Sequence, residues 1–376
     1  MVDEIFLTVK AHLRRKRQNN IMPFDVNEKN KALLAPLRRA QADFDANKVR
    51  NALKAICSAD LEVRMCFPFN DITGSKNFYT NCYEPLLAAL PNLERRDWIV
   101  ISGPDGNGKE WVGCGGHYFG TFVNPFLDIP PTGHLAHMRF HEFYRFENGK
   151  VIEIQAIWDI PELMLQSGVW PMVPSLGREF CVPGPATCDG LQSGERDESL
   201  SNASLDHVIA MLTDLKHVPD GPEEAMNMPH YWHEKMNWYG PAGTGTARGH
   251  RGFRNWHQIP FITGMPDRGK YPDKTEFHFF AENAYVGVTG WPDMHQTLSH
   301  GGWYGIPPLG KKVDMRSLDF WRLEVCDDGK QRIRENWVLW DMLDVYNQIG
   351  VDVFARMKEL SRPYERIVPD KVWKQK

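Results

Sequence analysis

The sequence predicts an α+β fold made of two tandem copies of one cone-shaped domain, and two observations carry this prediction. First, each half of the 376-residue chain places helical segments before a run of strand-like segments that short turns separate. Helices followed by consecutive antiparallel strands are typical of α+β domains, in which the helices cover one face of a curved sheet. Second, this order of segments occurs twice along the chain, so the same domain is expected twice.

The internal repeat is clearest toward the end of each half. Residues 138–146 (MRFHEFYRF) match residues 315–323 (MRSLDFWRL), and a Gly-Lys turn and then a Trp-Asp pair follow both blocks. Weaker matches join 98–103 to 285–290, 115–118 to 301–304, and Cys82 to His257. Because the blocks keep their order along the chain, we interpret them as two copies of one domain.

The elements of each copy follow from periodicity and turn signals. In the first copy we expect helices over 42–59 and 77–90, then strands over 97–102, 111–119, 137–146 and 151–158. In the second copy we expect strands over 276–281, 284–289, 297–304, 313–324 and 331–340. An aspartate, Asp159 or Asp341, follows the last strand of each copy and begins a closing helix.

These elements divide the chain into four segments. We expect an N-terminal extension over 1–40, a first domain over 41–170, a linker over 171–204, and a second domain with a C-terminal tail over 205–376. The linker is assigned because it contains several prolines and a polar Ser-Gly stretch. At the N-terminus, acidic residues precede a short apolar patch and basic residues follow it, which is the reverse of a secretion signal.

Composition excludes several classes of function. The net charge is −4, from 44 basic and 48 acidic residues, which gives no support to nucleic acid as a partner. No apolar run is long enough to suggest a membrane partner. The seven cysteines are odd in number and form no C-x-x-C pair, which favours a reducing, cytoplasmic location over a disulfide framework or a zinc site.

Asp341 and Asp159 are the first candidates for catalysis. A carboxylate at a strand end inside an aromatic cone is partly desolvated, and desolvation raises its pKa toward that of a useful general base. Both aspartates also begin a D-x-x-[DE] pattern, which is typical of a helix N-cap with an acidic first turn. The catalytic and the capping interpretation remain open for both residues.

Histidines and aromatic residues extend the candidate set. His257, His278 and His117 could orient the aspartate, hold a carbonyl oxygen or relay a proton. The expected substrate-binding residues are Trp238, Tyr239, His300, Trp303, Tyr304, Arg316 and Trp337. The aromatic residues could equally form core, and Arg316 could instead pair with a glutamate across its hairpin. We expect no metal site and no cofactor, because zinc-ligand spacing, a P-loop and a dinucleotide fingerprint are all missing from the sequence.

The second copy carries motifs that resemble the SnoaL-like polyketide cyclase family of the nuclear transport factor 2-like superfamily. These motifs are 238–241 (WYGP), 248–253 (RGHRGF), 335–341 (ENWVLWD) and 348–350 (QIG). The resemblance is stronger over 205–360 than over 42–170. It implies a curved antiparallel sheet wrapped on helices, and an aspartate at the position of Asp341 that serves as acid or base beside a carbonyl group.

The resemblance and the candidate residues together predict a cofactor-independent lyase or isomerase, of the cyclase or dehydratase type, that acts on a hydrophobic, carbonyl-containing small molecule. The alternatives are a non-catalytic small-molecule-binding or structural protein and an epoxide-type hydrolase. The copies differ at matched positions, with Asp319 opposite Glu142 and His257 opposite Cys82. We therefore expect one copy, the second, to be the more competent, and we expect two-domain chains to form a dimer.

Overall fold

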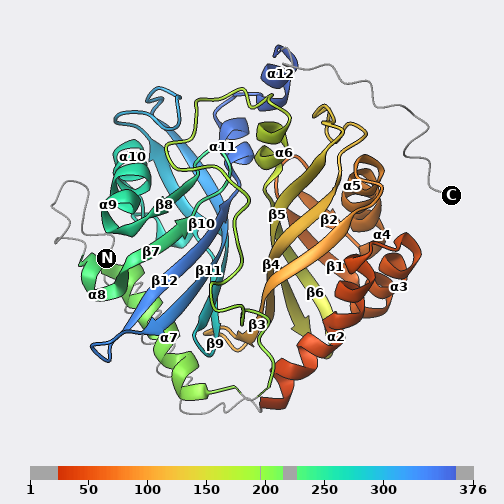
Figure 1. Cartoon of the computed structure of the whole chain (residues 1–376), viewed down its shortest axis with the longest axis horizontal. Coiled ribbons are helices and arrows are strands. Elements are labelled where there is room, and N and C mark those ends of the chain that lie inside the picture. Colours follow the sequence, from red (N-terminus) through yellow and green to blue (C-terminus); the bar gives the residue numbers. More distant parts are fainter. Residues whose placement is uncertain (1–23, 195, 215–226, 361–376) are drawn as a thin grey trace.

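The computed structural model describes residues 24–194, 196–214 and 227–360, and it contains two sheets with helices (Figure 1). Both sheets have six strands, in the order β2-β1-β6-β5-β4-β3 and β8-β7-β12-β11-β10-β9. Replacing each strand of the first sheet by the strand numbered six higher gives the second sheet. The two halves therefore share one topology, as the internal repeat predicts.

The first half contains α2 (Phe24–Ala42), α3 (Ala46–Ile56), β1 (Cys57–Met65), β2 (Asp71–Thr73), α4 (Ser75–Phe78), η1 (Tyr79–Tyr83), α5 (Glu84–Ala89), β3 (Glu94–Pro104), β4 (Glu110–Thr121), β5 (Leu135–Glu147), β6 (Lys150–Trp158) and α6 (Ile160–Gln166). Helix α2 lies inside the segment that we expected to be an extension, and it packs on β3 and α3. Strand β1 starts inside the segment expected to be the end of a helix.

The second half contains α7 (Glu198–Asp214), α8 (Met228–Tyr231), β7 (Trp232–Tyr239), β8 (Thr246–Arg248), α9 (Gly249–Phe253), η4 (Arg254–Gln258), α10 (Ile259–Gly264), η5 (Pro272–Lys274), β9 (Phe277–Glu282), β10 (Tyr285–Leu298), β11 (Lys311–Val325), β12 (Gln331–Trp340), α11 (Met342–Gln348) and α12 (Val353–Lys358). Both η1 and η4 are π-helical turns, and each is followed by a helix with proline in its first turn.

Local sequence explains the hairpins and the helix ends. Asn148 and Gly149 both have positive φ angles, 52° and 75°, which is the backbone that a tight β5–β6 hairpin requires. Asp45 caps α3 by accepting from the backbone N–H groups of Asn47 and Lys48. The sheets are mixed rather than wholly antiparallel, because β1 runs parallel to β6 and β7 runs parallel to β12.

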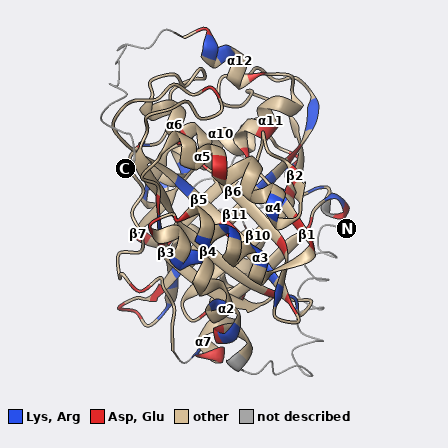
Figure 2. Cartoon of the chain, turned by 90° about the vertical axis from the view of Figure 1, so that its right-hand side faces the viewer, with Lys and Arg blue, Asp and Glu red and all other residues tan. Residues whose placement is uncertain are grey.

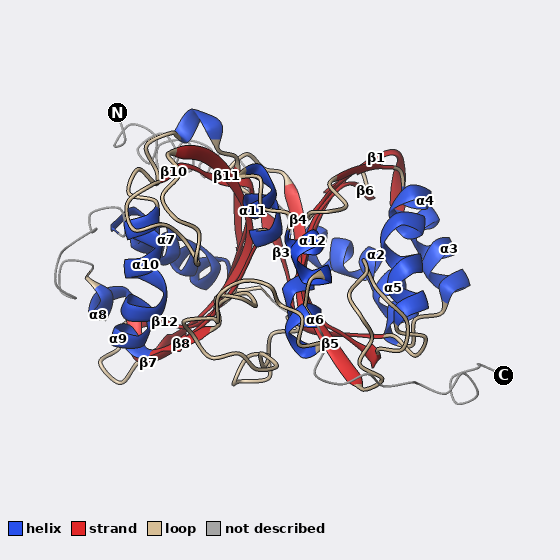
Figure 3. Ribbon diagram, turned by 90° about the horizontal axis from the view of Figure 1, so that it is seen from above, coloured by secondary structure: helices blue, strands red, loops and turns tan. Residues whose placement is uncertain are grey.

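The two sheets pack against each other through one face, which we call the outer face, and their helices cover the opposite, inner face (Figure 3). Phe143 of β5 stacks on Phe320 of β11 with ring centroids 5.0 Å apart, and Trp98 lies 5.5 Å from Trp337. A Cβ at Gly113 would lie 3.0 Å from both phenylalanine rings, so glycine permits this close approach. Figure 2 shows that acidic and basic residues are interspersed along the elements of the first half.

Strand pairing corrects the register of the repeat in two places. Strand β3 corresponds in the sheet order to β9, so residues 98–103 do not match 285–290, which lie in β10. Trp303 forms a bridge with Ile306, as Phe126 does with Ile129 in the first half. Trp303 therefore corresponds to Phe126 and not to His117, and most of the expected strand 297–304 is a loop after β10.

Candidate functional site

One acidic residue of the central hairpin faces the helices in each half. Glu142 of β5 and Asp319 of β11 directly precede Phe143 and Phe320, which lie on the outer faces. Because side chains alternate along a strand, the two acids project from the inner faces. A carboxylate among aromatic side chains needs hydrogen-bond donors or remains protonated, so its surroundings decide what each inner face can do.

The inner face of the first sheet satisfies its acid completely. Glu142 has no exposed surface and accepts hydrogen bonds from five side chains. The donors are Arg95 Nη1 at 2.5 Å, Tyr144 OH at 2.6 Å, Tyr118 OH at 2.8 Å, Trp158 Nε1 at 3.0 Å and Tyr83 OH at 3.4 Å. Arg95 also contacts Asp97 at 2.9 Å. This arrangement is a closed polar core in which the carboxylate has no free position for a ligand.

The inner face of the second sheet leaves its acid open. Within the described chain, Asp319 Oδ1 has no hydrogen-bond partner, and neither has the indole Nε1 of Trp340 or Trp321. Trp340 occupies the position of Trp158, and Trp321 that of Tyr144. In the first half both of these residues donate a hydrogen bond to Glu142. Asp319 is only half-buried, so solvent reaches it, and burial among protein atoms together with the nearby Asp293 raises its pKa well above the usual range.

A β-bulge brings a second acid to the same inner face. Between Gly290 and Met294, β10 contains two more residues than the stretch of β11 that pairs with it, whereas the equivalent β4–β5 ladder is continuous. The extra segment carries Asp293, whose Oδ2 accepts from Ser317 Oγ at 2.7 Å and whose Oδ1 lacks a partner among the described residues. Burial raises the pKa of Asp293 to about 7. Bulges often re-aim side chains beside active sites.

His257 lies at the helical side of this inner face, in the π-helical turn η4. Its ring stacks on Trp238 with centroids 4.0 Å apart and an interplanar angle of 15°, and it lies 5.4 Å from Trp340. Burial lowers the pKa of His257 well below its usual range, so the ring is neutral near pH 7. Its Nδ1 has no hydrogen-bond partner in the described part of the chain. Cys82 occupies the matching position of η1 in the first half.

Asp341 lies between the two halves rather than on an inner face. Its Oδ2 accepts from the backbone N–H of Phe67 at 2.8 Å and from Arg316 Nη1 at 3.3 Å. Its Oδ1 caps α11 by accepting from Asp344 N at 3.2 Å, which is the capping interpretation that the sequence left open. Burial, with a contribution from Asp344, raises the pKa of Asp341 to about 7.

Asp159 repeats this placement from the other side. It accepts from the backbone N–H of Ala242 at 2.9 Å and contacts Arg139 Nη2 at 3.3 Å, but it makes no side-chain cap bond to α6. Burial raises its pKa to about 6 although Arg139 acts in the opposite direction. Asp159 and Asp341 line one crevice of about 270 Å³ of empty space, part of it open to solvent.

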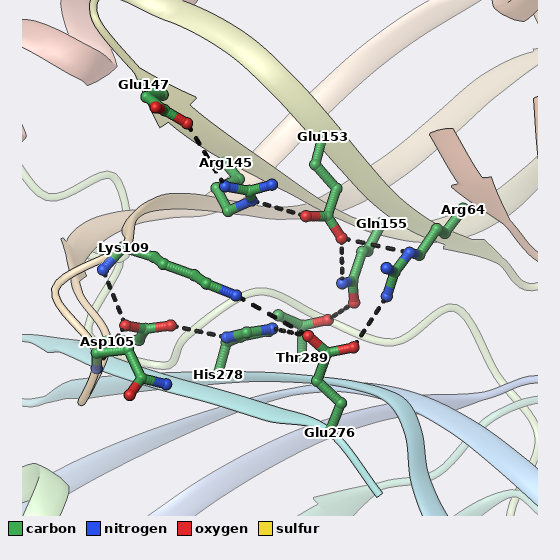
Figure 4. Close-up of polar contacts among 11 residues, drawn as sticks. Arg64, Asp105, Lys109, Arg145, Glu147, Glu153, Gln155, Glu276, His278 and Thr289 are labelled. Carbon is green, nitrogen blue, oxygen red and sulfur yellow. Dashed lines mark hydrogen bonds and ion pairs between the residues drawn. The ribbon is translucent and has the colours of Figure 1, made fainter. Parts of the chain in front are cut away.

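His278 belongs to a polar network that joins the halves (Figure 4). Its Nδ1 lies 2.7 Å from Asp105 Oδ2 of the β3–β4 turn, and its Nε2 lies 3.1 Å from Glu276 Oε1. Glu276 also accepts from Arg64 of β1 at 3.1 Å. Burial opposes ionisation of Asp105, but the hydrogen bonds from His278 and the turn backbone outweigh it and lower the pKa. The histidine therefore lies in the interface, away from Asp319.

The remaining candidate residues are distributed over four places. His117 faces the interface, where its Nδ1 accepts from Trp98 Nε1 at 3.1 Å, and Trp337 and Tyr239 stack on each other there at 5.4 Å. His300 is exposed. Trp303 and Tyr304 lie in the β10–β11 loop, where Trp303 packs 5.4 Å from Tyr346 of α11. Arg316 pairs with Asp341 and not with Glu335, which Arg322 binds at 2.6 Å.

Of the proposed set, the structure thus brings only His257 and Trp238 to the inner face of the second sheet. The sequence reasoning missed Asp319 and Asp293 as site residues. The signal for Asp319 was present, since it is an acid at the position that Glu142 holds in the first copy, between the apolar residues Leu318 and Phe320. Nothing in the periodicity reveals Asp293, because a bulge changes the register locally.

The described residues also bear on metal binding and on membrane crossing. Within 24–194, 196–214 and 227–360, no group of three or more His, Cys, Asp or Glu side chains has an arrangement that could hold a metal ion. None of the helices in these ranges combines the length and the apolar character that a membrane crossing needs.

Comparison with known proteins finds a similarity in the first half. Residues 37–167 match the family model of the SnoaL-like polyketide cyclase. The match falls on the copy that we expected to resemble the family less. The second half departs from the first by the bulge in β10 and by a shorter strand, β9, in place of β3. No curated protein matches the chain.

Solved structures similar to the chain come from several bacteria. AclR of Streptomyces galilaeus, a proposed hydroxylase, is 23% identical, covers 39% of this chain and 89% of its own, and has a TM-score of 0.32. A proposed SnoaL-like polyketide cyclase from Jannaschia sp. CCS1 is 17% identical, with 39% and 94% covered and a TM-score of 0.33. IdmH of Streptomyces antibioticus, a proposed polyketide cyclase, is 18% identical, with 37% and 98% covered and a TM-score of 0.31. Residues 37–167 are thus similar to the SnoaL-like polyketide cyclase family over about a third of the chain, and a second body of the same topology follows them.

Proposed function

We propose that the inner face of the second sheet is the active site of a cofactor-independent lyase or isomerase that uses acid/base catalysis on a hydrophobic, carbonyl-containing small molecule. The supporting observation is the pair Asp319 and Asp293. Both are surrounded by protein, both keep one oxygen without a partner among the described residues, and the pKa of both is raised. Two carboxyl groups with raised pKa values can provide an acid and a base in one site.

The two acids differ in a way that assigns their roles. Because the pKa of Asp293 is about 7, a substantial fraction of this residue is ionised near neutrality, and it can remove a proton from a carbon next to a carbonyl group. Burial raises the pKa of Asp319 well above its usual range, and in its protonated form it can donate a hydrogen bond to the carbonyl oxygen as enolate charge develops there. Ring closure, loss of water or movement of a double bond can follow from such an enolate.

The aromatic residues suit an apolar substrate. Trp238 and Trp340 both stack on neutral His257 at the same inner face. Flat rings of this kind bind unsaturated or polycyclic molecules through their large apolar surface. The described residues of the first half contribute no comparable open acid, so we propose that the first half serves as a structural partner for the second.

Enolisation provides a test that does not require the natural substrate. The α-protons of 2-tetralone are followed by proton NMR in buffered D₂O, and the enzyme is expected to exchange them faster than buffer alone. Asp293→Asn removes the base and should lower this rate at least about 100-fold. Asp327→Asn, an exposed acid of the β11–β12 turn, is the matched control and should leave the rate unchanged.

Asp341→Asn separates this proposal from the assignment made on sequence alone. Because the Asp341 carboxylate binds Phe67 and Arg316 between the halves, we expect the variant to keep the exchange rate within about threefold, far less than the loss of a general base would cause. If Asp341→Asn abolishes exchange while Asp293→Asn retains it, the proposed site is wrong.

An epoxide-type hydrolase is the second candidate, and one observation favours it. One protonated and one ionised carboxyl group could protonate an epoxide oxygen and activate a water molecule. Styrene oxide opening, measured with the same variants, distinguishes the two chemistries. If neither reaction is accelerated, the remaining proposal is a non-catalytic binding or structural protein.

The assignments of compartment and assembly also remain proposals. All seven cysteines are free thiols, which supports a reducing, cytoplasmic location. The outer faces of both sheets are covered within one chain, so a dimer of two-domain chains would have to use another surface.

A further inference from the structure

Arg268 is a charged side chain near the proposed acids for which the described residues supply no acceptor. It follows α10, and its guanidinium lies over the Phe261 ring, 5.3 Å from the centroid. Among the described residues, no carboxylate oxygen lies within 4.0 Å of its nitrogens, and no side-chain hydrogen bond holds it. The side chain is half-buried, so its N–H donors are partly removed from water without being satisfied.

Arg95 on the first inner face shows the contrasting case. Its guanidinium contacts Glu142 at 2.5 Å, Asp97 at 2.9 Å and Gln41 at 3.1 Å, and it has no exposed surface. Each half therefore places one arginine near two acids, but only the first half closes the ion pairs. The second arginine keeps its planar fork of donors available for a bound molecule.

The charges of Asp293 and Asp319 do not fully balance the positive charge of Arg268 near pH 7. The positive charge lowers the pKa of both acids, but burial outweighs it and keeps both raised. Near neutrality the group therefore carries one full positive charge and less than two negative charges. A protonated carboxyl group beside the arginine also donates a hydrogen bond to an incoming anion instead of repelling it.

We propose that the second inner face binds an aromatic or polycyclic organic acid and that Arg268 pairs with the carboxylate of this ligand. A carboxylate matches the guanidinium fork with two parallel hydrogen bonds, which gives both energy and orientation. The rings of Trp238, His257 and Trp340 would contact the apolar part of the same molecule. The inference rests on the proposed function for the location of the ligand, but it does not require turnover.

Calorimetric titration with 2-naphthoate and with its uncharged amide, 2-naphthamide, tests the pairing. The wild-type chain is expected to bind the acid at least about tenfold more tightly than the amide, as a charge-assisted bidentate pair implies. Arg268→Gln should abolish this preference and leave the affinity for the amide unchanged. Arg268→Lys keeps the charge without the fork and should retain part of the preference.

Arg251→Gln is the matched control, because Arg251 is an exposed arginine of α9 and its removal changes the net charge equally. It should keep the full preference for the acid. Melting temperatures of all variants show whether they are folded. Equal affinities of the wild type for acid and amide, no binding of the acid at millimolar concentration, or an Arg268→Gln variant that still prefers the acid would each overturn the inference.

The naphthoate titration and the tetralone exchange experiment can fail independently of each other. If naphthoate binds through Arg268 but 2-tetralone is not enolised, the anion site stands and the catalytic proposal fails. If enolisation depends on Asp293 but the acid has no advantage over the amide, catalysis stands and the anion site fails.

Discussion

The inner faces of the two sheets have the same strand order and carry an acid at the same position, but their polar groups are arranged in opposite ways. In the first, Glu142 is surrounded by donors and ion-paired with Arg95. In the second, Asp319 is one methylene shorter, its indole neighbours do not reach it, and Arg268 makes no ion pair with it. The same topology thus supports a fully hydrogen-bonded carboxylate in one copy and, among the described residues, carboxylates that each keep an unpaired oxygen in the other.

This difference shows what fold similarity contributes to a functional argument. The family match falls on the first half, where the chemistry is closed, whereas the open acids lie in the second. Buried polar groups without partners cost stability, so a protein retains them where a ligand or a reaction supplies the missing contacts. We therefore base the proposed site on unpaired groups rather than on the half that resembles the family more.

The largest expected effect is the loss of stability that follows removal of Glu142, compared with removal of Asp319 at the matched position. Glu142→Ala would leave Arg95 and four other donors without their acceptor in a region that has no exposed surface. Loss of one member of a buried ion pair costs about 3–5 kcal/mol, so we expect this drop in the free energy of unfolding. Asp319→Ala should cost less than about 1 kcal/mol, because no hydrogen bond to a described residue is lost.

Urea denaturation of both variants measures this contrast. Equal destabilisation by the two substitutions would show that Asp319 has structural partners, and the distinction between a closed and an open inner face would then fail. The comparison is independent of any substrate, since it concerns only how the protein satisfies its own groups.

The sequence supported the architecture better than the site. The tandem α+β fold, the helix start at Asp341 and the equivalence of Cys82 and His257 follow from local patterns, and the structure confirms them. The position of Asp341 between the halves depends on the loop that contains Phe67, which is distant in sequence. No local pattern contains that contact. For the same reason the outer-face role of Trp337 could not be distinguished from a pocket wall.

The two crevice aspartates make stability depend on pH in a defined direction. Because the pKa of Asp341 in the folded chain is about 7 and the ordinary value is 3.8, the folded state binds more protons than the unfolded state between about pH 4 and 7. Stability from this group therefore falls as the pH rises through that window and is level above it. At about 1.4 kcal/mol per pKa unit, the total is at most about 4 kcal/mol.

Asp341→Asn removes this titration, so unfolding free energies measured at pH 5 and pH 8 should differ less in the variant than in the wild type. Asp159→Asn should have a smaller effect of the same sign, since its pKa is raised only to about 6. A wild-type chain that becomes more stable from pH 5 to pH 8, with Asp341→Asn unchanged in slope, would contradict the raised pKa.

The smallest expected effect is a difference in stability between two variants, each of which loses one indole N–H group from an inner face. Trp158 Nε1 donates to Glu142 at 3.0 Å, whereas Trp340 Nε1 at the matched position has no partner among the described residues. Replacement by phenylalanine removes the N–H and part of the ring volume in both cases, so the cost of lost packing is shared. Trp158→Phe additionally loses a charge-assisted hydrogen bond worth about 1.5–3 kcal/mol, and it should therefore be more destabilising than Trp340→Phe by about that amount. Thermal and urea denaturation of the two variants at one pH measure this difference. A difference near zero would mean that the second indole is satisfied as fully as the first, and the second inner face would then offer a ligand one donor fewer.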